Sequence, residues 1–223
     1  MMTPYAPQSE MRSQAKAAPR ASTPLLVVIS APSGGGKTTL CQQLLAARPE
    51  MTRAITCTTR PARPGEEEGV DYYFLDAASF FRREQAGSFL EHATVYGYSY
   101  GTLKSEVLSK LRQGRNVLLN VDVQGAATLR ERARQDPELG QALVSVFLTP
   151  PSMALLEARL RKRGTDAPEV IEKRLGMARQ EIAQWSHFDY LVLSSSIAED
   201  LRRTLAIVEA ESLRCPRMSP PEL

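Results

Sequence analysis

Residues 31–39 read Ala31-Pro32-Ser33-Gly34-Gly35-Gly36-Lys37-Thr38-Thr39, directly after the apolar run Leu25-Leu26-Val27-Val28-Ile29. Glycines let a backbone curl tightly, so that successive N–H groups point toward one anion. Lys37 adds a mobile positive charge for the outer phosphates, and the hydroxyl of Thr38 suits Mg²⁺. A helix expected from Thr38 aims its positive dipole end at the same place. The stretch predicts a phosphate-binding loop in a nucleotide-binding protein.

The usual pattern of such a loop begins with glycine, whereas this chain has Ala31 at that position. A flexible glycine-rich turn is therefore the alternative interpretation. The context favours the phosphate loop, because strand-like residues precede it and a helix-forming run follows at 40–47. We expect all nine residues from Ala31 to Thr39 to surround the phosphates.

The composition suits one globular domain with room for a lid or an inserted subdomain. The 223 residues are 43% hydrophobic, and the net charge of +3 is too weak to argue for nucleic acid. No stretch approaches the ~20 apolar residues of a membrane span, so no membrane partner is expected. Three scattered cysteines predict reduced thiols, rather than disulfides or a metal site, and a cytoplasmic protein.

Both ends of the chain read as tails. Residues 1–23 are rich in Ala, Pro, Ser and Gln without apolar periodicity, which predicts disorder. Their basic residues weakly resemble an organelle transit peptide, and the run that follows could mimic a signal-peptide core. Cleavage there would destroy the phosphate loop, so a solvated tail is the favoured interpretation. Residues 215–223 contain three prolines and predict a second loose tail.

Short apolar runs alternate with helical patterns along the rest of the chain. Strands are predicted at 25–30, 116–123, 143–148 and 190–193, and helices at 38–47, 103–113, 152–163, 168–185 and 198–214. This alternation indicates an α/β fold whose parallel sheet is covered on both faces. Ser152 and Pro168 are placed to begin their helices.

Two segments interrupt that rhythm. Residues 53–102 carry aromatic, Thr and Arg residues with little alternation and predict an inserted subdomain. Residues 159–176 contain the break Arg163-Gly164-Thr165-Asp166 between two helical arms. Such an arrangement suits a hinged lid over the phosphate loop.

Ordered motifs fill the inserted segment. Arg60 and Arg63 lie three apart in a proline-stiffened loop and could fork around a phosphate, although two such arginines alone are more often solvated. Further along stand Val70-Asp71-Tyr72-Tyr73-Phe74, Phe89-Leu90-Glu91-His92-Ala93 and Tyr96-Gly97-Tyr98-Ser99-Tyr100-Gly101-Thr102. Together with the phosphate loop, these motifs resemble guanylate kinase of the bacterial type. The resemblance covers about residues 25–213.

The resemblance implies the nucleoside-monophosphate kinase fold with a phosphate loop, as one domain over 24–214. That domain would carry the 53–102 GMP-binding subdomain and the helical lid. The implied activity is transfer of the ATP γ-phosphate to GMP or dGMP, giving ADP and GDP in purine nucleotide metabolism. ATP and GMP would be its partners and Mg²⁺ its cofactor, and a homo-oligomer is left open.

The resemblance also implies roles for individual residues. The GMP phosphate would be held by Arg60, Arg63, Tyr72 and Tyr100, and the guanine by Thr56, Glu91, Thr102 and Asp122. Lys37, Arg60, Arg163 and Arg174 would act in catalysis, and Thr38 would hold the metal. The chemistry of guanine agrees independently, because its N1 and N2 donors match a carboxylate that adenine would leave unpaired. Phosphoryl transfer needs positioning rather than a general base.

The chain departs from the family pattern at four places. Thr56 replaces an expected serine and keeps its hydroxyl. Asn120 stands where an acidic residue is expected two positions before Asp122, which puts a metal role there in doubt. Ser194-Ser195-Ser196 replaces an expected Asn-Asp-Asp near the adenine. Residues 131–141 resemble an insertion and predict a surface loop.

Two other functions are compatible with the same motifs. A guanylate-kinase-like domain can serve as a non-catalytic interaction module, which the intact Lys37 and Thr38 and the two lid arginines disfavour. A related kinase could phosphorylate a phosphorylated ribose, which the complete guanine set disfavours. The sequence thus favours the GMP kinase.

Overall fold

The computed structural model describes residues 22–95, 97–163 and 167–219. Its main sheet has five parallel strands in the order β2-β7-β1-β8-β9. The strands are β1 Leu26–Ser30, β2 Thr52–Arg53, β7 Val117–Asn120, β8 Leu143–Thr149 and β9 Tyr190–Leu193. The predicted α/β class with a parallel core is confirmed. The short β2 was not predicted, and β7 ends three residues earlier than expected because Asp122 begins the next helix.

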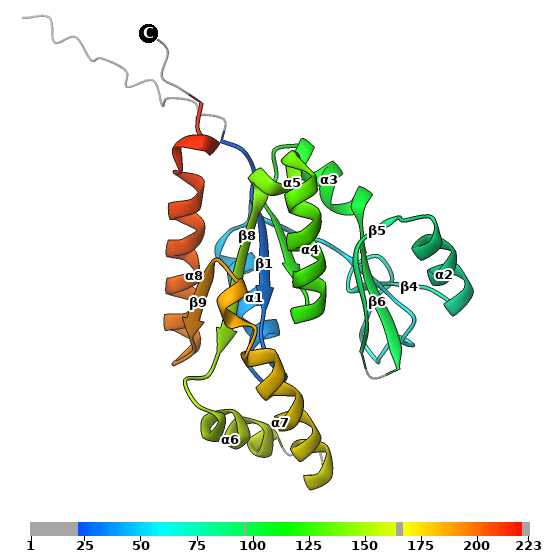
Figure 1. Ribbon diagram of the computed structural model, residues 1–223, viewed down its shortest axis with the longest axis vertical. Coiled ribbons are helices and arrows are strands. Elements are labelled where there is room, and N and C mark those ends of the chain that lie inside the picture. The colour runs from blue at the N-terminus through cyan, green and yellow to red at the C-terminus, as the bar shows by residue number, and fades with distance from the viewer. Residues whose placement is uncertain (1–21, 96, 164–166, 220–223) are drawn as a thin grey trace, which may run out of the picture.

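Helices cover both faces of this sheet (Figure 1). α1 (Lys37–Ala47) and α8 (Ile197–Ser212) pack on one face, and α3 (Lys104–Arg112), α4 (Val123–Gln135) and α5 (Pro137–Ala142) on the other. Alternate residues of β1 serve the two cores, with Val27 facing α1 and α8 while Val28 faces the opposite helices. Burial on both faces explains why these strands read as continuous apolar runs.

The predicted surface loop at 131–141 is wrong. α4 continues to Gln135, and α5 follows after Asp136, whose carboxylate caps it by accepting from the N–H groups of Glu138 and Leu139. Leu139 is buried in the core between the helices and the sheet. Charged residues occupy the exposed face of α4, so few apolar positions mark the helix in the sequence.

A second sheet forms the separate lobe at the right of Figure 1. Its strands, in spatial order, are β4 (Tyr72–Phe74), β3 (Thr56–Thr58), β6 (Tyr98–Leu103) and β5 (Phe89–Val95). α2 (Ala77–Gln85), which was not predicted, buries Phe80 against Cys57 and Phe89 on one face. Arg53 belongs to the main sheet, so this lobe begins at Thr56.

The predicted lid, residues 159–176, overlaps two packed helices that extend beyond it, α6 (Met153–Arg163) and α7 (Pro168–Ile182). They bury a small core of their own, made by Leu156, Leu160, Ile171, Leu175 and Ala178. The hydroxyl of Ser152 accepts a hydrogen bond from Leu155 N at 3.2 Å, and Pro168 opens α7, both as predicted. α7 ends three residues before the predicted position, and a short 3₁₀ turn (η1, Trp185–His187) follows.

The first and last described residues of the chain meet beside α5 and β8. The predicted tail 1–23 lies outside the described residues up to Ala21, and Thr23 N donates to Arg217 O at 2.8 Å. The loose tail predicted from 215 is wrong for its first residues, which form a 3₁₀ turn (η2, Cys215–Arg217). Arg217 is buried and donates to Glu211 Oε2 and to the carbonyl oxygen of Gln141.

Within the described parts of the chain, no helix has the length and apolar character needed to cross a membrane.

Candidate active site

The phosphate loop connects β1 to α1. Gly36 stands at the N-cap of α1 with φ +95°, and Gly34 has φ +83°, a region that favours glycine. Gly35 N donates to the carbonyl oxygen of Pro32 at 2.8 Å, which closes the turn. A Cβ on Gly34 would lie only 2.7 Å from Leu160 Cδ2 of the lid. Gly34 is therefore favoured for two reasons. Its backbone has a positive φ, and the lid packs so closely on the loop that a side chain would collide with Leu160.

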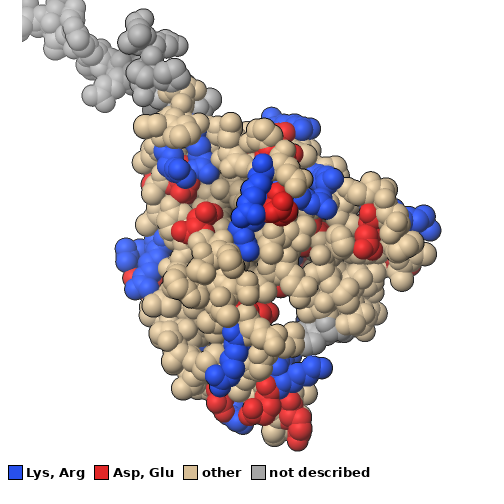
Figure 2. All heavy atoms as spheres, in the orientation of Figure 1, with Lys and Arg blue, Asp and Glu red and all other residues tan. Residues whose placement is uncertain are grey.

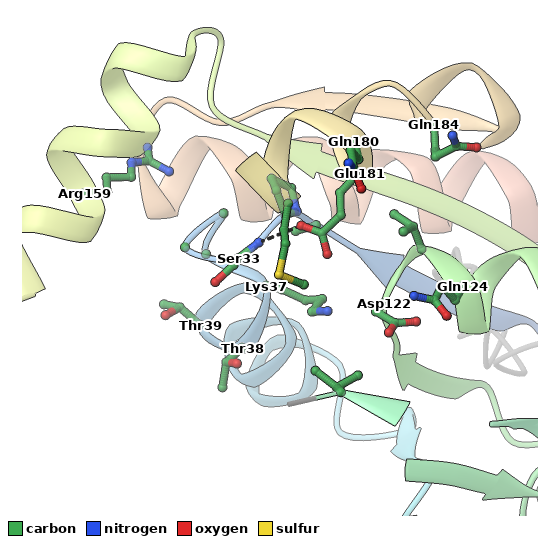
Figure 3. Close-up of a pocket in the computed structure, with 18 of the residues that line it drawn as sticks. Ser33, Lys37, Thr38, Thr39, Asp122, Gln124, Arg159, Gln180, Glu181 and Gln184 are labelled. Carbon is green, nitrogen blue, oxygen red and sulfur yellow. Dashed lines mark hydrogen bonds between the residues drawn. The ribbon is translucent and has the colours of Figure 1, made fainter. Parts of the chain in front are cut away.

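The loop forms the floor of a cleft of about 1000 Å³. All nine residues predicted to surround phosphates line it, from Ala31 to Thr39. Asp122 and the start of α4 form one wall, and α6 and α7 contribute Arg159, Lys162 and Glu181 (Figure 3). Figure 2 shows the molecule hollowed between the lid and the lobe of the small sheet. The arrangement offers N–H groups, hydroxyls and a cation to a polyphosphate.

Lys37 points into this cleft from the first turn of α1 (Figure 3). Its Nζ donates to the carbonyl oxygen of Val121 at 2.9 Å. Burial lowers the pKa of Lys37, while the carboxylates of Asp122 and Glu181 oppose that shift. A desolvated cation with few fixed partners interacts strongly with any anion that enters.

Glu181 of α7 was not foreseen from the sequence. Its Oε2 accepts a hydrogen bond from Ser33 N of the phosphate loop at 3.3 Å. Burial raises the pKa of this carboxyl group, while the contact with Ser33 and the charge of Lys37 oppose the shift. The available signal was the polar set Gln180 and Glu181 at the end of α7 and Gln184 just after it, all of which line the cleft.

A smaller pocket of about 270 Å³ adjoins the loop. It is lined by Gly36, Thr39, Leu40, Arg159, Ser194, Ser195, Ser196, Ile197 and Asp200. The hydroxyl of Ser194 donates to Asp200 Oδ2 at 2.6 Å and accepts from Arg159 Nη1 at 3.1 Å. The three serines that depart from the family pattern thus lie beside a carboxylate supplied by α8.

Four of the predicted acceptor residues form one row across the small sheet. Thr56 is paired with Tyr72 on one side and with Thr102 on the other, and Thr102 is paired with Glu91. Directly paired residues point to the same face of a sheet. The register of β5 shifts by one residue between Phe89 and Glu91. Phe89 therefore packs under α2 while Glu91 turns to the opposite face.

Glu91 is a buried carboxyl group, only 3% exposed. Its Oε1 accepts a hydrogen bond from the hydroxyl of Thr102 at 2.6 Å. Burial raises its pKa to about 7, with a further contribution from Asp122, while the contact with Thr102 opposes the shift. Asp122 caps α4 by accepting from Gly125 N at 2.8 Å, and it also lines the large cleft. Among the residues predicted to bind guanine, Asp122 is therefore the one that lines the cleft and also lies near enough to Glu91 to affect its pKa.

The residues expected to hold the acceptor phosphate gather around Tyr72. The guanidinium of Arg60 lies 5.4 Å from the centroid of that ring, and the rings of Tyr72 and Tyr100 are 6.2 Å apart. Arg60 Nη2 donates to both carboxylate oxygens of Glu66, at 2.8 and 2.9 Å. The hydrogen bonds with Arg60 and with the backbone N–H of Arg63 hold the pKa of Glu66 below its usual range. Arg63 itself is exposed.

Other predicted residues lie away from the cleft or outside the description. The side chain of Arg163 lies outside the described residues, and Arg174 is half-buried on α7. Among the residues described, neither Arg174 nor Asn120 lines the cleft, where the lid instead presents Arg159 and Lys162. The residues on the small sheet that were expected to bind GMP also lie outside that lining: Thr56, Tyr72, Glu91, Tyr100 and Thr102. The residues expected around ATP and those expected around GMP therefore form two separate groups.

Comparison with known proteins gives a consistent result. Residues 23–211 match the family described as guanylate kinase. The guanylate kinase of Coxiella burnetii is 45% identical over 189 residues, which cover 85% of this chain and 88% of that protein. That of Maricaulis maris is 40% identical over 85% of this chain and 84% of that protein. The crystal structure of guanylate kinase from Anaplasma phagocytophilum aligns with a TM-score of 0.71 at 33% identity, over 89% of this chain and 92% of that one.

Proposed function

We propose a division of roles among these residues from one premise: the chain belongs to the guanylate kinase family. The enzyme transfers the γ-phosphate of ATP to GMP and releases ADP and GDP. We further propose that dGMP is also an acceptor. The observation that carries the role assignment is the row of Tyr72, Thr56, Thr102 and Glu91 on one face of the small sheet.

The phosphate loop holds the donor. Its N–H groups and the ammonium of Lys37 bind the β- and γ-phosphate oxygens of ATP, because both are anion-binding groups facing the same cleft. The exposed hydroxyl of Thr38 also lines this cleft, and an oxygen ligand of this kind fits Mg²⁺. When bound, Mg²⁺ would neutralise charge on the phosphates.

The small sheet holds the acceptor. Arg60, Arg63, Tyr72 and Tyr100 bind the GMP phosphate, with Glu66 fixing the plane of the Arg60 guanidinium. Glu91, with Thr56, Thr102 and Asp122, binds guanine. A buried carboxylate accepts hydrogen bonds from guanine N1 and N2, whereas adenine would leave it unpaired. Sites of that kind reject the wrong partner by roughly 10⁴-fold.

The lid completes the site. Arg163 and Arg174 are proposed to approach the ATP phosphates as α6 and α7 close over the loop. Closure would exclude water and align the acceptor phosphate oxygen with the γ-phosphorus, which is most of what phosphoryl transfer requires. The GMP phosphate is already largely ionised near pH 7, so no general base is needed. A cytoplasmic location and the oligomeric state stay predictions.

A coupled assay of ADP release tests the proposal. The purified protein is given Mg²⁺-ATP with GMP, dGMP, AMP or a ribose phosphate as acceptor. We expect turnover with GMP and dGMP and a preference of roughly 10⁴ over AMP. Turnover with the ribose phosphate alone would instead identify a sugar-phosphate kinase. No turnover with any acceptor would identify a non-catalytic module.

A further inference from the structure

Gly125 is a glycine in a position where the backbone does not require one. It lies in the first turn of α4 and is not among the glycines with positive φ. Its N–H donates to Asp122 Oδ1 at 2.8 Å, a bond that any residue except proline could make. Within helices only proline is less favourable than glycine, so alanine would be preferred here on local grounds.

The reason for glycine lies across the interface with the small sheet. A Cβ on Gly125 would lie 2.6 Å from Glu91 Oε2 and 3.3 Å from its Cδ. The nearest other atom would be Val121 Cβ, at 3.2 Å. The group with which an added methyl would collide most severely is therefore the end of a side chain rather than a backbone.

Glu91 is held on both sides. One oxygen accepts from the hydroxyl of Thr102 at 2.6 Å, and the other lies against the bare backbone of Gly125. The side chain is buried, so it cannot turn into solvent without losing that contact. Its position is thus fixed jointly by β6 and by the absence of a side chain on α4.

We propose that Gly125 is a positioning residue for guanine specificity. Because Gly125 has no side chain, the Glu91 carboxylate can lie beside it. From that position the carboxylate accepts hydrogen bonds from guanine. This inference rests on the proposed role of Glu91.

An alanine at this position would move the carboxylate. Restoring an ordinary contact from 2.6 Å requires a displacement of about 1 Å, and a misplacement of that size can reduce a rate by roughly 10²-fold. For Gly125→Ala we expect kcat/KM for GMP to fall by about 10- to 100-fold. The dissociation constant of ATP and the turnover of AMP should stay within about twofold, because neither Gly125 nor Glu91 lines the cleft of the phosphate loop and AMP does not pair with the carboxylate.

Gly176→Ala provides a matched control. Gly176 is also a helical glycine, on α7, and an added Cβ would meet no atom within 4 Å. This variant should keep the GMP-to-AMP preference of the wild type, so that any loss in Gly125→Ala is not a general effect of alanine in a helix.

A double-mutant cycle shows whether Gly125 acts through Glu91. Glu91→Asp shortens the side chain by one methylene and vacates the space that the alanine methyl needs. Gly125→Ala should therefore reduce kcat/KM for GMP strongly in the wild type and by less than about threefold in the Glu91→Asp background. If Gly125→Ala does not fold alone, folding of the double variant would attribute the defect to the same clash.

Each remaining outcome is decisive. An unchanged GMP-to-AMP preference in folded Gly125→Ala, alongside a reduced preference in Glu91→Gln, would overturn the role of Gly125 and leave that of Glu91 intact. Equal losses of ATP and GMP affinity would show a merely structural role and overturn it too. An unchanged preference in Glu91→Gln would overturn both, beginning with the proposed function.

Discussion

The carboxylate of Glu181 accepts a hydrogen bond from Ser33 N at 3.3 Å, across 148 residues of sequence. A lid helix thereby places an anion on the loop that we propose to hold phosphates (Figure 3). The positive charge of Lys37 also attracts this carboxylate and opposes the rise of its pKa. Glu181 thus accepts from one of the backbone N–H groups that we propose for the phosphates of ATP.

Replacing this carboxylate should strengthen ATP binding. Glu181→Gln keeps an oxygen that can accept from Ser33 but removes a negative charge beside the phosphates, so we expect KM for ATP to fall by about tenfold. Gln184→Asn, a change of a neutral residue in the same lining, should leave it unchanged. Steady-state kinetics at saturating GMP measure both variants. A higher KM for ATP in Glu181→Gln would show that the carboxylate supports nucleotide binding.

Removing the ammonium of the phosphate loop should abolish most of the turnover. Lys37→Ala loses a charge that stabilises the phosphoryl group as it transfers, and we expect kcat to fall by about 10²- to 10³-fold. GMP binding, measured by calorimetry, should stay nearly intact because the acceptor residues belong to another lobe. Lys173→Ala, on the exposed surface of α7, is the control. Near-normal turnover in Lys37→Ala would refute the assignment of the loop.

Discrimination between purines should depend on the charge of Glu91. The Glu91→Gln side chain matches the shape of the original but presents an amide that can donate toward guanine N1. We expect the preference for GMP over AMP to fall by at least about 10²-fold, with little change in the melting temperature. Parallel kcat/KM measurements on the two acceptors decide this. A preserved preference would mean that guanine is read elsewhere.

The pH dependence of stability offers a separate test of the same residue. Because burial raises the pKa of Glu91 from 4.5 to about 7, the folded chain binds a proton that the unfolded chain releases between these values. The free energy of unfolding therefore falls as pH rises through this range, and the penalty is complete above about pH 7. Glu91→Gln does not titrate, so its stability relative to the wild type should rise between pH 5 and pH 8 by up to about 3 kcal/mol.

Urea unfolding of the nucleotide-free proteins at the two pH values measures this difference. Glu172→Gln, on the exposed face of α7, controls for the loss of one negative charge. A difference between Glu91→Gln and wild type that does not change with pH would show that the native carboxyl titrates normally.

The buried end of the chain should contribute to stability but not to catalysis. Arg217→Ala leaves the carboxylate of Glu211 without its buried partner, which we expect to cost about 3 kcal/mol. Arg214→Ala removes an exposed partner of the same carboxylate and should cost less than about 1 kcal/mol. Denaturant titration compares the two, with kcat for GMP unchanged in both. A cost below about 1 kcal/mol for Arg217→Ala would show that this buried pair adds little stability.

Local patterns predicted much of the fold. The helices of the lid and four strands of the main sheet were found from apolar runs and from the caps at Ser152 and Pro168. α4 was missed because its exposed face is dense in charge and conceals its few buried positions, and α5 because six residues show too little apolar periodicity around Leu139. The register shift that separates Phe89 from Glu91 was also unforeseen, since regular alternation would place both on one face.

By itself, the sequence predicted the phosphate loop, and its resemblance to a family implied the side chains expected around GMP. The loop could be recognised because its residues are contiguous, with Lys37 and Thr38 directly after the glycines, and the structure places residues 31–39 along one cleft. Only the tertiary structure revealed three contacts between separate parts of the fold. Glu181 accepts from Ser33, Glu91 lies where a side chain on Gly125 would be, and Arg217 pairs with Glu211. Each of these depends on atoms from different elements meeting at van der Waals or hydrogen-bond distance. Such distances are set by how helices and sheets pack, and no local pattern of residues encodes them.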